Sequence, residues 1–199
     1  MIIHKHLDDN FEYDGSQINP NWGFKRFKIK GSSIITWIGS MNIKNENLKD
    51  YEDVGLDIKS NEIINCVVEH FDIQPGNLRT AYIRQRLLVM ILSEELTKQG
   101  VKTLREGDDI YIHTSKKSKL TVSIATASLN SIKIHLGINL TDDGSPDDVD
   151  VVGLYQLKDK EGNSYFNQGN VVEFIDKFVN HYINELQDIE LDVSKTSVF

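Results

Sequence analysis

One stretch in the middle of the chain constrains the fold more than any other part of the sequence. It consists of three segments that each alternate apolar and polar residues, as half-buried β-strands do. The chemically active residues of these segments fall near the strand beginnings and ends, where a single pocket can gather them. We therefore expect neighbouring strands of one sheet, with Lys119, Asp109 and Asn139 converging on one cavity. The three segments are residues 105–111, 119–126 and 135–140.

The bulk composition is that of an ordinary globular protein. Of the 199 residues, 39% are hydrophobic and 26% are charged, so we expect one domain over residues 1–199 with a sizeable core. The formal net charge of -8 argues against a protein that binds nucleic acid through its overall charge. Cys66 is the single cysteine, which excludes an intramolecular disulfide and a cysteine-rich zinc site.

Neither the first residues nor the apolar runs indicate export or membrane insertion. Residues 1–6 are too short and too polar for a signal peptide. No apolar run approaches the roughly 20 residues of a membrane span. We therefore expect a cytoplasmic protein with no membrane partner.

The strongest helix signal lies just before the central strands. Apolar spacing predicts a helix over residues 78–99, and Gly100 follows as a plausible stop. Its predicted core-facing stripe consists of Ile83, Leu87, Met90, Ile91 and residues 94–96.

Two further helices are predicted from spacing and capping residues. Residues 61–71 place apolar side chains at i, i+3 and i+4, with Ser60 as the N-cap. Residues 171–186 show the same periodicity, and Asn170 and Glu173 form a pair similar to a capping box.

The remaining periodic segments read as strands. Two or three strands are predicted within residues 24–44, broken by a turn at residues 31–33. Helices and strands alternate only loosely, and short turns join adjacent strands. This order favours an α+β fold with a mixed, mostly antiparallel sheet covered by helices. Four more strands are predicted at about residues 101–105, 109–114, 119–126 and 132–140.

Four residues of the central stretch carry the candidate chemistry. Lys119 opens a largely apolar strand, although it is also consistent with a solvated lysine beside Lys116 and Lys117. Asp108 and Asp109 form either a turn or a carboxylate pair that could hold Mg²⁺ at nucleotide phosphates. Asn139 lies in an apolar strand, where its amide needs a partner; it is either a ligand contact or a satisfied residue at the sheet end.

The three segments resemble the catalytic core of biotin–protein ligases and, somewhat less, of lipoate–protein ligases. The ligase pattern runs Lys-Trp-Pro-Asn-Asp-Leu, Lys-Leu-x-Gly-Ile-Leu and Gly-Ile-Asn-Val. Here residues 105–110 read Arg-Glu-Gly-Asp-Asp-Ile, residues 119–124 read Lys-Leu-Thr-Val-Ser-Ile, and residues 137–140 read Gly-Ile-Asn-Leu. The whole chain is also similar to a small archaeal family of uncharacterised proteins assigned to this ligase-like fold. The segments that resemble that family's motifs are residues 13–17, 50–53, 69–71 and 84–88.

The resemblance implies roles for the matching residues. Lys119 would contact the carboxylate of a small acid and the α-phosphate of a nucleotide, where an ammonium neutralises developing charge. Asp109 would lie near the nucleotide and its metal, and Asn139 on the same side of the pocket. Arg105, Asp108, Ser123, His135 and Arg84 complete the predicted ligand- and nucleotide-binding set. ATP and Mg²⁺ are the implied cofactors, and an acceptor protein is an implied partner.

The chain departs from the ligase pattern at three points. Asp108 stands where the ligases have asparagine, and Val122 stands where they have glycine in the lysine strand. The glycine- and arginine-rich loop that wraps the acyl-adenylate in the ligases has no counterpart.

Several other polar residues are each consistent with two interpretations, one structural and one functional. Arg84 and Arg86 are two residues apart and cannot share one helix face, so at most one reaches the pocket. His135 alternates with apolar neighbours and is either exposed or pocket-lining. His70, next to Glu69, is either a metal ligand or a structural histidine. The turn at residues 50–53 is either solvated or functional, and the acidic loop at residues 142–150 is either a solvated turn or a calcium site.

Three functions remain open on the sequence alone. The first is an ATP-dependent acyl ligase or acyltransferase that acts on a small carboxylic acid. The second is a non-catalytic module that binds a small molecule or nucleotide in the same pocket. The third is an RNA-associated protein, against which the net charge argues. The sequence leaves open whether the protein forms a homo-oligomer.

Overall fold

The computed structural model describes residues 1–113, 116–146 and 148–198. The described residues form a five-stranded sheet in the order β1-β2-β3-β8-β7 and a three-stranded sheet in the order β4-β5-β6. In the large sheet β1 runs parallel to β2, and the other pairs are antiparallel. The predicted mixed, mostly antiparallel α+β class is thus confirmed.

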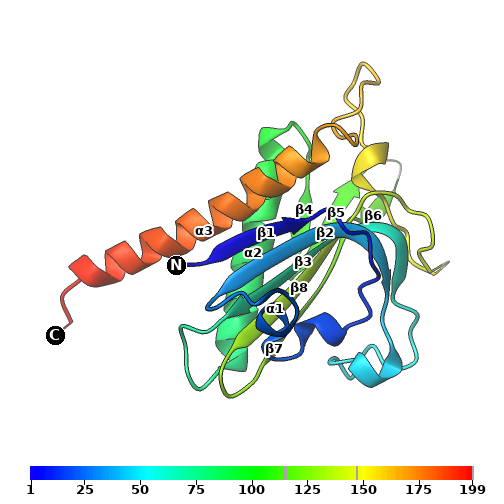
Figure 1. The fold of residues 1–199 in the computed structure, drawn as a ribbon. Coiled ribbons are helices and arrows are strands. Elements are labelled where there is room, and N and C mark those ends of the chain that lie inside the picture. The colour runs from blue at the N-terminus through cyan, green and yellow to red at the C-terminus, as the bar shows by residue number, and fades with distance from the viewer. Residues whose placement is uncertain (114–115, 147, 199) are drawn as a thin grey trace.

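The large sheet is built from strands that are far apart in the sequence (Figure 1). β3 and β8 form its centre, and β1 and β7 form its edges. Its strands are β1 (Ile3–Leu7), β2 (Ser33–Asn42), β3 (Lys59–His70), β8 (Ile132–Asn139) and β7 (Thr121–Ala127). The small sheet consists of β4 (Leu104–Glu106), β5 (Asp109–His113) and β6 (Lys117–Lys119).

Two long helices cover one face of the large sheet. α2 (Leu78–Lys98) and α3 (Val171–Lys195) pack with alternate residues of β3 and β8 into the larger apolar core. Figure 1 shows α3 crossing this side and its C-terminal turns projecting past the sheet. None of the helices among the described residues has the length and apolar character to cross a membrane.

The opposite face is covered mainly by irregular chain. The short helices η1 (Ser16–Ile18) and α1 (Trp22–Phe27) pack here, together with residues 43–58, which contain η2 (Asn45–Asn47). We call residues 43–58 the covering segment. The smaller apolar core lies beneath it, with Trp37 of β2 fully buried.

Two predicted elements are wrong in type. Residues 61–71 are not a helix but most of β3, whose two faces are both buried, so that apolar residues occur at helical spacing as well. The strand predicted around residue 24 is α1, and only β2 (Ser33–Asn42) of that region is a strand.

The helix predictions are right in place and partly wrong in detail. α2 ends as expected, with Gly100 at a φ of +91°, where glycine avoids the strain of a side chain. Its buried face, however, does not include Ile83 or Met90, which are 62% and 44% exposed. α3 begins at Val171 as predicted and runs nine residues further, to Lys195. Asn170 does not cap it through its side chain. Ile91, Glu95 and Leu96 of the predicted stripe are buried, and the other residues that α2 buries are Ala81, Gln85, Leu88, Val89 and Leu92.

Candidate functional site: two joined compartments beneath the covering segment

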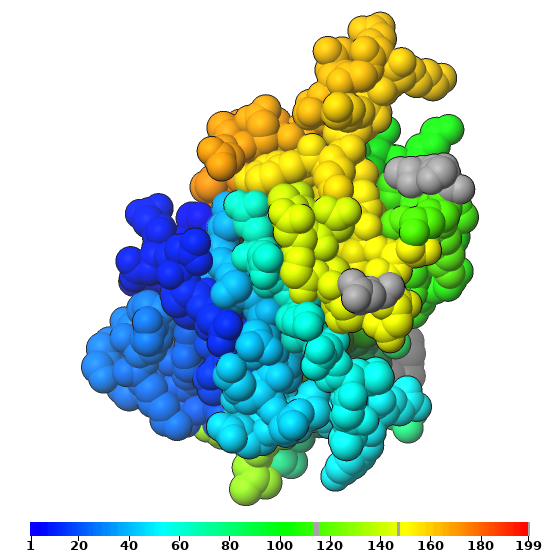
Figure 2. Space-filling view, turned by 90° about the vertical axis from the view of Figure 1, so that its right-hand side faces the viewer, coloured from blue at the N-terminus to red at the C-terminus, as the bar shows by residue number. Residues whose placement is uncertain are grey.

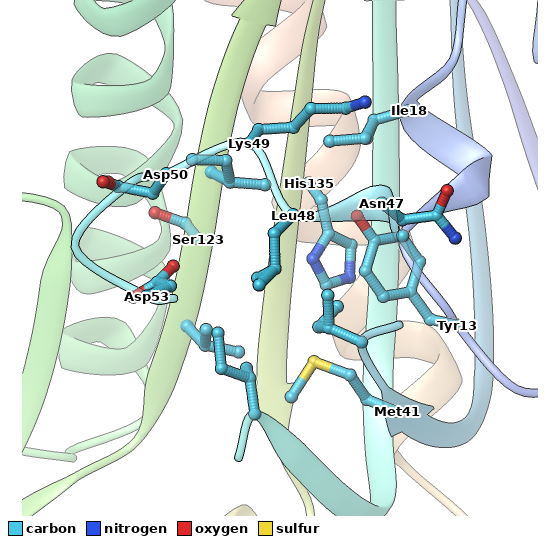
Figure 3. Close-up of a pocket in the computed structure, with 15 residues that line it drawn as sticks. Tyr13, Ile18, Met41, Asn47, Leu48, Lys49, Asp50, Asp53, Ser123 and His135 are labelled. Carbon is cyan, nitrogen blue, oxygen red and sulfur yellow. The ribbon is translucent and has the colours of Figure 1, made fainter. Parts of the chain in front are cut away.

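A partly open cavity lies between the covering segment and the sheet. It comprises about 410 Å³ of space, and we call it the apolar compartment. Figure 3 shows the side chains of Leu48, from the covering segment, and His135, from β8, next to each other in this space. Such a shape buries the body of a small ligand on several sides. The apolar side chains that line it are Ile18, Met41, Ile43, Leu48, Ile58, Val122 and Ile124.

A second, larger cavity adjoins the first. This polar compartment comprises about 1090 Å³ of space, and its lining includes Lys119 and Asn139. Figure 2 shows the covering segment and residues 140–146 and 148–150 side by side on the same face of the molecule. Because both compartments share lining residues, they form one continuous site. The shared residues are Met41, Asp50, Asp53, Ile58, Val122 and Ser123.

Lys119 and Asp109 form an ion pair at the edge of the polar compartment. The Lys119 Nζ lies 3.0 Å from the Asp109 Oδ2, and the two side chains are 29% and 24% exposed. They come from the end of β6 and the beginning of β5 in the small sheet. Lys119, Asp109 and Asn139 therefore do lie around one cavity. The expectation that residues 105–140 form one sheet is wrong, because β5 and β6 belong to the small sheet and β7 and β8 to the large one.

Asp108 is held by partners from α2 and β7. It forms an ion pair with Arg86, and its Oδ2 accepts hydrogen bonds from the Ser123 hydroxyl at 2.8 Å and from the Gln85 Nε2 at 2.9 Å. Burial alone would raise the pKa of Asp108, but the bonds from Arg86 and Ser123 outweigh burial and lower the pKa. Asp108 is therefore an ionised carboxylate with its charge already balanced.

The magnesium role of Asp108 and Asp109 stays a prediction. Both carboxylates face a cation of the protein itself, Arg86 and Lys119 respectively. In residues 1–113, 116–146 and 148–198, no group of three or more histidine, cysteine, aspartate or glutamate side chains is placed to hold a metal ion.

The acidic residues of the covering segment also face the polar compartment. The pKa of Asp53 is raised by burial and by Asp50, although the charge of Lys119 opposes this effect. Among the described residues, six aspartates but only two lysines line the compartment. Their summed charge repels ligands with several negative charges unless a cation accompanies them.

Asn139 is fixed by the backbone of the residue that links the two sheets. Its Nδ2 donates to the Leu120 carbonyl oxygen at 3.1 Å, and its backbone N–H donates to the same oxygen at 3.0 Å. This supports the reading of a satisfied sheet-end asparagine, while the side chain still lines the polar compartment.

His135 forms the floor of the apolar compartment together with Tyr13. The two rings are stacked, with centroids 3.6 Å apart and an angle of 8° between their planes. The His135 Nε2 lies 3.1 Å from the Asn65 Oδ1. Burial lowers the pKa of His135 to about 3, so the ring is neutral at neutral pH. Of the two readings of His135, the pocket-lining one is the observed one.

Two predicted site residues lie elsewhere. The Arg84 guanidinium binds both oxygens of the Asp72 carboxylate, at 2.8 Å and 2.6 Å, beside a groove between α2 and α3. Arg105 is exposed, and its guanidinium donates to the Gly107 carbonyl oxygen of its own turn. Of the two α2 arginines, Arg86 is the one that reaches the site, through Asp108.

Neighbouring polar residues have structural partners. Lys116 and Lys117 are exposed and pair with Asp150 and Glu106. His70 is buried and lies 3.1 Å from the Tyr182 hydroxyl, as expected of a structural histidine. Cys66 is buried in β3, and burial raises the pKa of its thiol to about 12. The acidic loop includes residue 147, which lies outside the described residues.

Sequence reasoning missed several residues of the site. Tyr13 and the covering segment reach it from distant parts of the chain, and Gln85 is a buried polar residue of α2. The motifs at residues 13–17, 50–53 and 84–88 were the available signal, because all three contribute lining or supporting side chains.

The sequence matches the family described as "Domain of unknown function (DUF366)" over residues 2–197. The chain belongs to this family. The uncharacterised protein MJ0805 of the archaeon Methanocaldococcus jannaschii is 38% identical to this DUF366 protein over 196 residues, which cover 96% of this chain and 82% of that protein. The predicted membership of an uncharacterised archaeal family with a ligase-like fold is confirmed.

Solved structures of similar shape fall into two groups. A protein of unknown function from Pyrococcus horikoshi is 31% identical to the DUF366 chain, with a TM-score of 0.86 and full coverage of both chains. The biotin protein ligase from Aquifex aeolicus, solved with biotin and ATP, is 13% identical, with a TM-score of 0.57 over 94% of this chain and 72% of that one. Ta0514 from T. acidophilum, solved with bound lipoic acid, is 10% identical, with a TM-score of 0.58 over 92% and 85%. At such identities the likeness to the second group concerns the fold.

Proposed function

We propose that this protein binds a small monocarboxylic acid with an apolar body. The observation that carries the proposal is the continuity of the two compartments, an apolar cavity that joins, at Val122 and Ser123, a polar one with Lys119 at its edge. The apolar compartment would bury the body of the acid. Lys119 would then meet its carboxylate with a charge-assisted hydrogen bond.

The charges around Lys119 favour a single negative charge on the ligand. Lys119 is already paired with Asp109 at 3.0 Å, and Asp50 and Asp53 face the same space. One carboxylate can share the ammonium with Asp109, whose side chain keeps contact with solvent. A second negative charge would meet mainly aspartates and would be repelled. The site therefore suits a monocarboxylate better than a diacid.

Isothermal titration calorimetry with straight-chain acids from butanoic to decanoic acid tests the proposal. We expect saturable binding with an optimum in chain length, because the apolar compartment offers a limited space of about 410 Å³. Octanamide, which lacks the charge, should bind at least tenfold more weakly than octanoic acid. Absence of binding by the whole series, or equal affinity for acid and amide, would contradict the proposal.

A second candidate function is ATP-dependent activation of the bound acid. The observation that favours it is the position of Lys119 beside Asp109 on a fold shared with a ligase solved with biotin and ATP. An ammonium at this place would stabilise charge that develops when a carboxylate attacks a phosphorus atom. The acidic lining would require Mg²⁺ to accompany the nucleotide, and an acceptor protein would take the acyl group.

Pyrophosphate release separates the two candidates. Purified protein with ATP, Mg²⁺ and the best-binding acid should release pyrophosphate only if the acid is activated. Binding of the acid without pyrophosphate release would identify a non-catalytic module, a result that the missing glycine- and arginine-rich loop favours.

A further inference from the structure

The hydroxyl of Tyr13 is a buried donor without a protein partner. Tyr13 is fully buried, and among the described residues no side chain or backbone group hydrogen-bonds its hydroxyl oxygen. Buried hydroxyl groups are nearly always paired, because an unpaired one loses its bond to water without replacement. Figure 3 shows this hydroxyl among the labelled side chains of the apolar compartment, not directed away from them.

The position of Tyr13 is fixed from both its backbone and its ring. Its N–H donates to the Ser40 carbonyl oxygen at 2.8 Å, and its carbonyl oxygen accepts from the Asn42 N–H at 2.9 Å, which ties residue 13 to β2. The stacked ring of His135 prevents the phenol from tilting out of its plane. The hydroxyl therefore cannot turn to find a partner in the protein.

The neighbouring His135 presents an acceptor. The amide nitrogen of Asn65 lies 3.5 Å from the Ile63 carbonyl oxygen, which assigns the Asn65 oxygen to the His135 Nε2. The Nε2 must then carry the proton of the neutral ring, and Nδ1 is left as an acceptor. The inner end of the apolar compartment thus offers one donor, from Tyr13, and one acceptor, from His135.

We propose that Tyr13 and His135 recognise a neutral polar group, an amide or a hydroxyl, at the end of the ligand opposite its carboxylate. This inference rests on the proposed acid-binding function. An amide both accepts a hydrogen bond, here from the Tyr13 hydroxyl, and donates one, here to the His135 ring. A purely alkyl chain would leave both groups unpaired. The ligand class is therefore an acid that is charged at one end and neutral but polar at the other.

Three acids of one chain length test this inference by calorimetry. Octanoic acid ends in a methyl group, suberic acid monoamide ends in an amide, and suberic acid ends in a second carboxylate. We expect the monoamide to bind the wild-type protein at least tenfold more tightly than octanoic acid. Tyr13→Phe should remove this advantage, so that the ratio of the two affinities falls to about one, while the phenyl ring preserves the stacking on His135.

The stability of the ligand-free variant is an independent readout. Since the hydroxyl has no partner in the protein, Tyr13→Phe should unfold at the same temperature as the wild type or at a higher one. A lower unfolding temperature would mean that the hydroxyl is bonded within the protein, and it would overturn the inference. If the variant failed to fold, the comparison of the three acids on the wild-type protein would still decide.

The outcomes separate this inference from the proposed function. If none of the three acids binds, the proposed function itself fails. If octanoic acid binds and the monoamide gains nothing, only the recognition of a neutral polar end is wrong. Tightest binding of suberic acid would show that the inner end recognises a charge, with Lys49 of the covering segment as the nearby cation, and would also overturn the inference.

Discussion

The two faces of the five-stranded sheet bury different chemistry. The face that α2 and α3 cover presents apolar side chains of β3 and β8, such as Ile64, Val68 and Leu136. The face beneath the covering segment buries Asn65, Glu69, Lys133 and His135 from the same two strands. Because neighbouring residues of a strand point to opposite faces, one pair of strands serves both a helix-packed core and a polar interior.

The two ends of the polar interior differ in whether their buried polar side chains have hydrogen-bond partners among the described residues. Glu69 accepts hydrogen bonds from the Asn21 backbone N–H at 2.9 Å and from the Ser131 hydroxyl at 2.7 Å. Lys133 donates to the Ser128 hydroxyl oxygen at 2.8 Å. At the other end the Tyr13 hydroxyl has no partner among the described residues. The hydrogen-bonded end therefore ties the start of α1 and the loop between β7 and β8 to the sheet, and the other end is where a ligand is expected.

The largest effect should come from the helix-covered face. Phe178→Ala removes a fully buried ring of α3, and we expect it to lower the free energy of unfolding by about 3–5 kcal/mol. Ile83→Ala on α2 is the matched control and should cost less than about 0.5 kcal/mol, because that side chain is largely exposed. Urea denaturation measures both. Equal losses would mean that the helix faces are assigned incorrectly.

The next largest effect concerns the polar compartment. Lys119→Ala should weaken binding of octanoic acid by roughly 2–4 kcal/mol if the bound carboxylate is buried, with little change in unfolding temperature. Lys116→Ala and Lys117→Ala remove exposed lysines that pair with Asp150 and Glu106, and they should leave binding nearly unchanged. Calorimetry that gave similar small losses for all three variants would make Lys119 one more surface charge.

A smaller effect should appear in the pH dependence of stability. Burial lowers the pKa of His135 to about 3, below the ordinary value near 6.5, so between these pH values the unfolded chain binds a proton that the folded chain refuses. The contribution of neutral His135 to the free energy of unfolding is therefore fully present above about pH 6.5. It decreases as the pH falls toward 3, by up to about 1.4 kcal/mol per pH unit. His135→Gln should remove this contribution, as urea denaturation at pH 7 and pH 5 would show.

His70 provides the same test on the helix-covered face. Burial, reinforced by the charge of Arg84, lowers its pKa to about 3, so His70→Gln should also flatten the pH dependence. It should cost more stability at pH 7 than His135→Gln, because the hydrogen bond with Tyr182 lies in the packed core. If both variants kept the wild-type slope, the two histidines would not be buried in their neutral form.

The smallest effect concerns the junction of the two compartments. Val122 lies opposite Gly137 of β8, and a Cβ on Gly137 would come within 2.9 Å of the Val122 side chain, so the glycine makes room for the valine. Val122→Ala should cost about 1 kcal/mol of stability and should widen the junction. Acids branched near the carboxylate should then bind the variant more tightly than the wild type, and unchanged selectivity in calorimetry would contradict this role of Val122.

The sequence predicted well where local patterns decide the structure. Short alternating segments marked β5, β7 and β8, and long helical periodicity marked α2 and α3. It failed at β3 because a central strand buried on both faces has no alternation to distinguish it from a helix. The face of α2 was misjudged in part because Gln85 is buried with a polar partner, Asp108. Apolar spacing alone cannot reveal such a pair.

The site was predictable only in part for a similar reason. Lys119, Asp109 and Asn139 lie within one short stretch of chain, so their spacing placed them near one another. Tyr13 and Leu48 reach the same cavity through contacts between distant segments. No local pattern specifies such contacts, and the cover of the site could therefore not be derived from composition or periodicity.

Leu120 makes the length of the chain between the two sheets critical. Its N–H donates to the Ile110 carbonyl oxygen of β5 at 2.8 Å, and its carbonyl oxygen accepts from Asn139 of β8. One inserted residue here would turn Ser123 to the face that Val122 now occupies, because each step along a strand reverses the side chain. We expect this junction to tolerate no insertion or deletion, whereas the covering segment, which pairs with neither sheet over most of its length, should tolerate changes of length. Natural variation in ligand size would then arise in the cover, above a lysine whose position stays fixed.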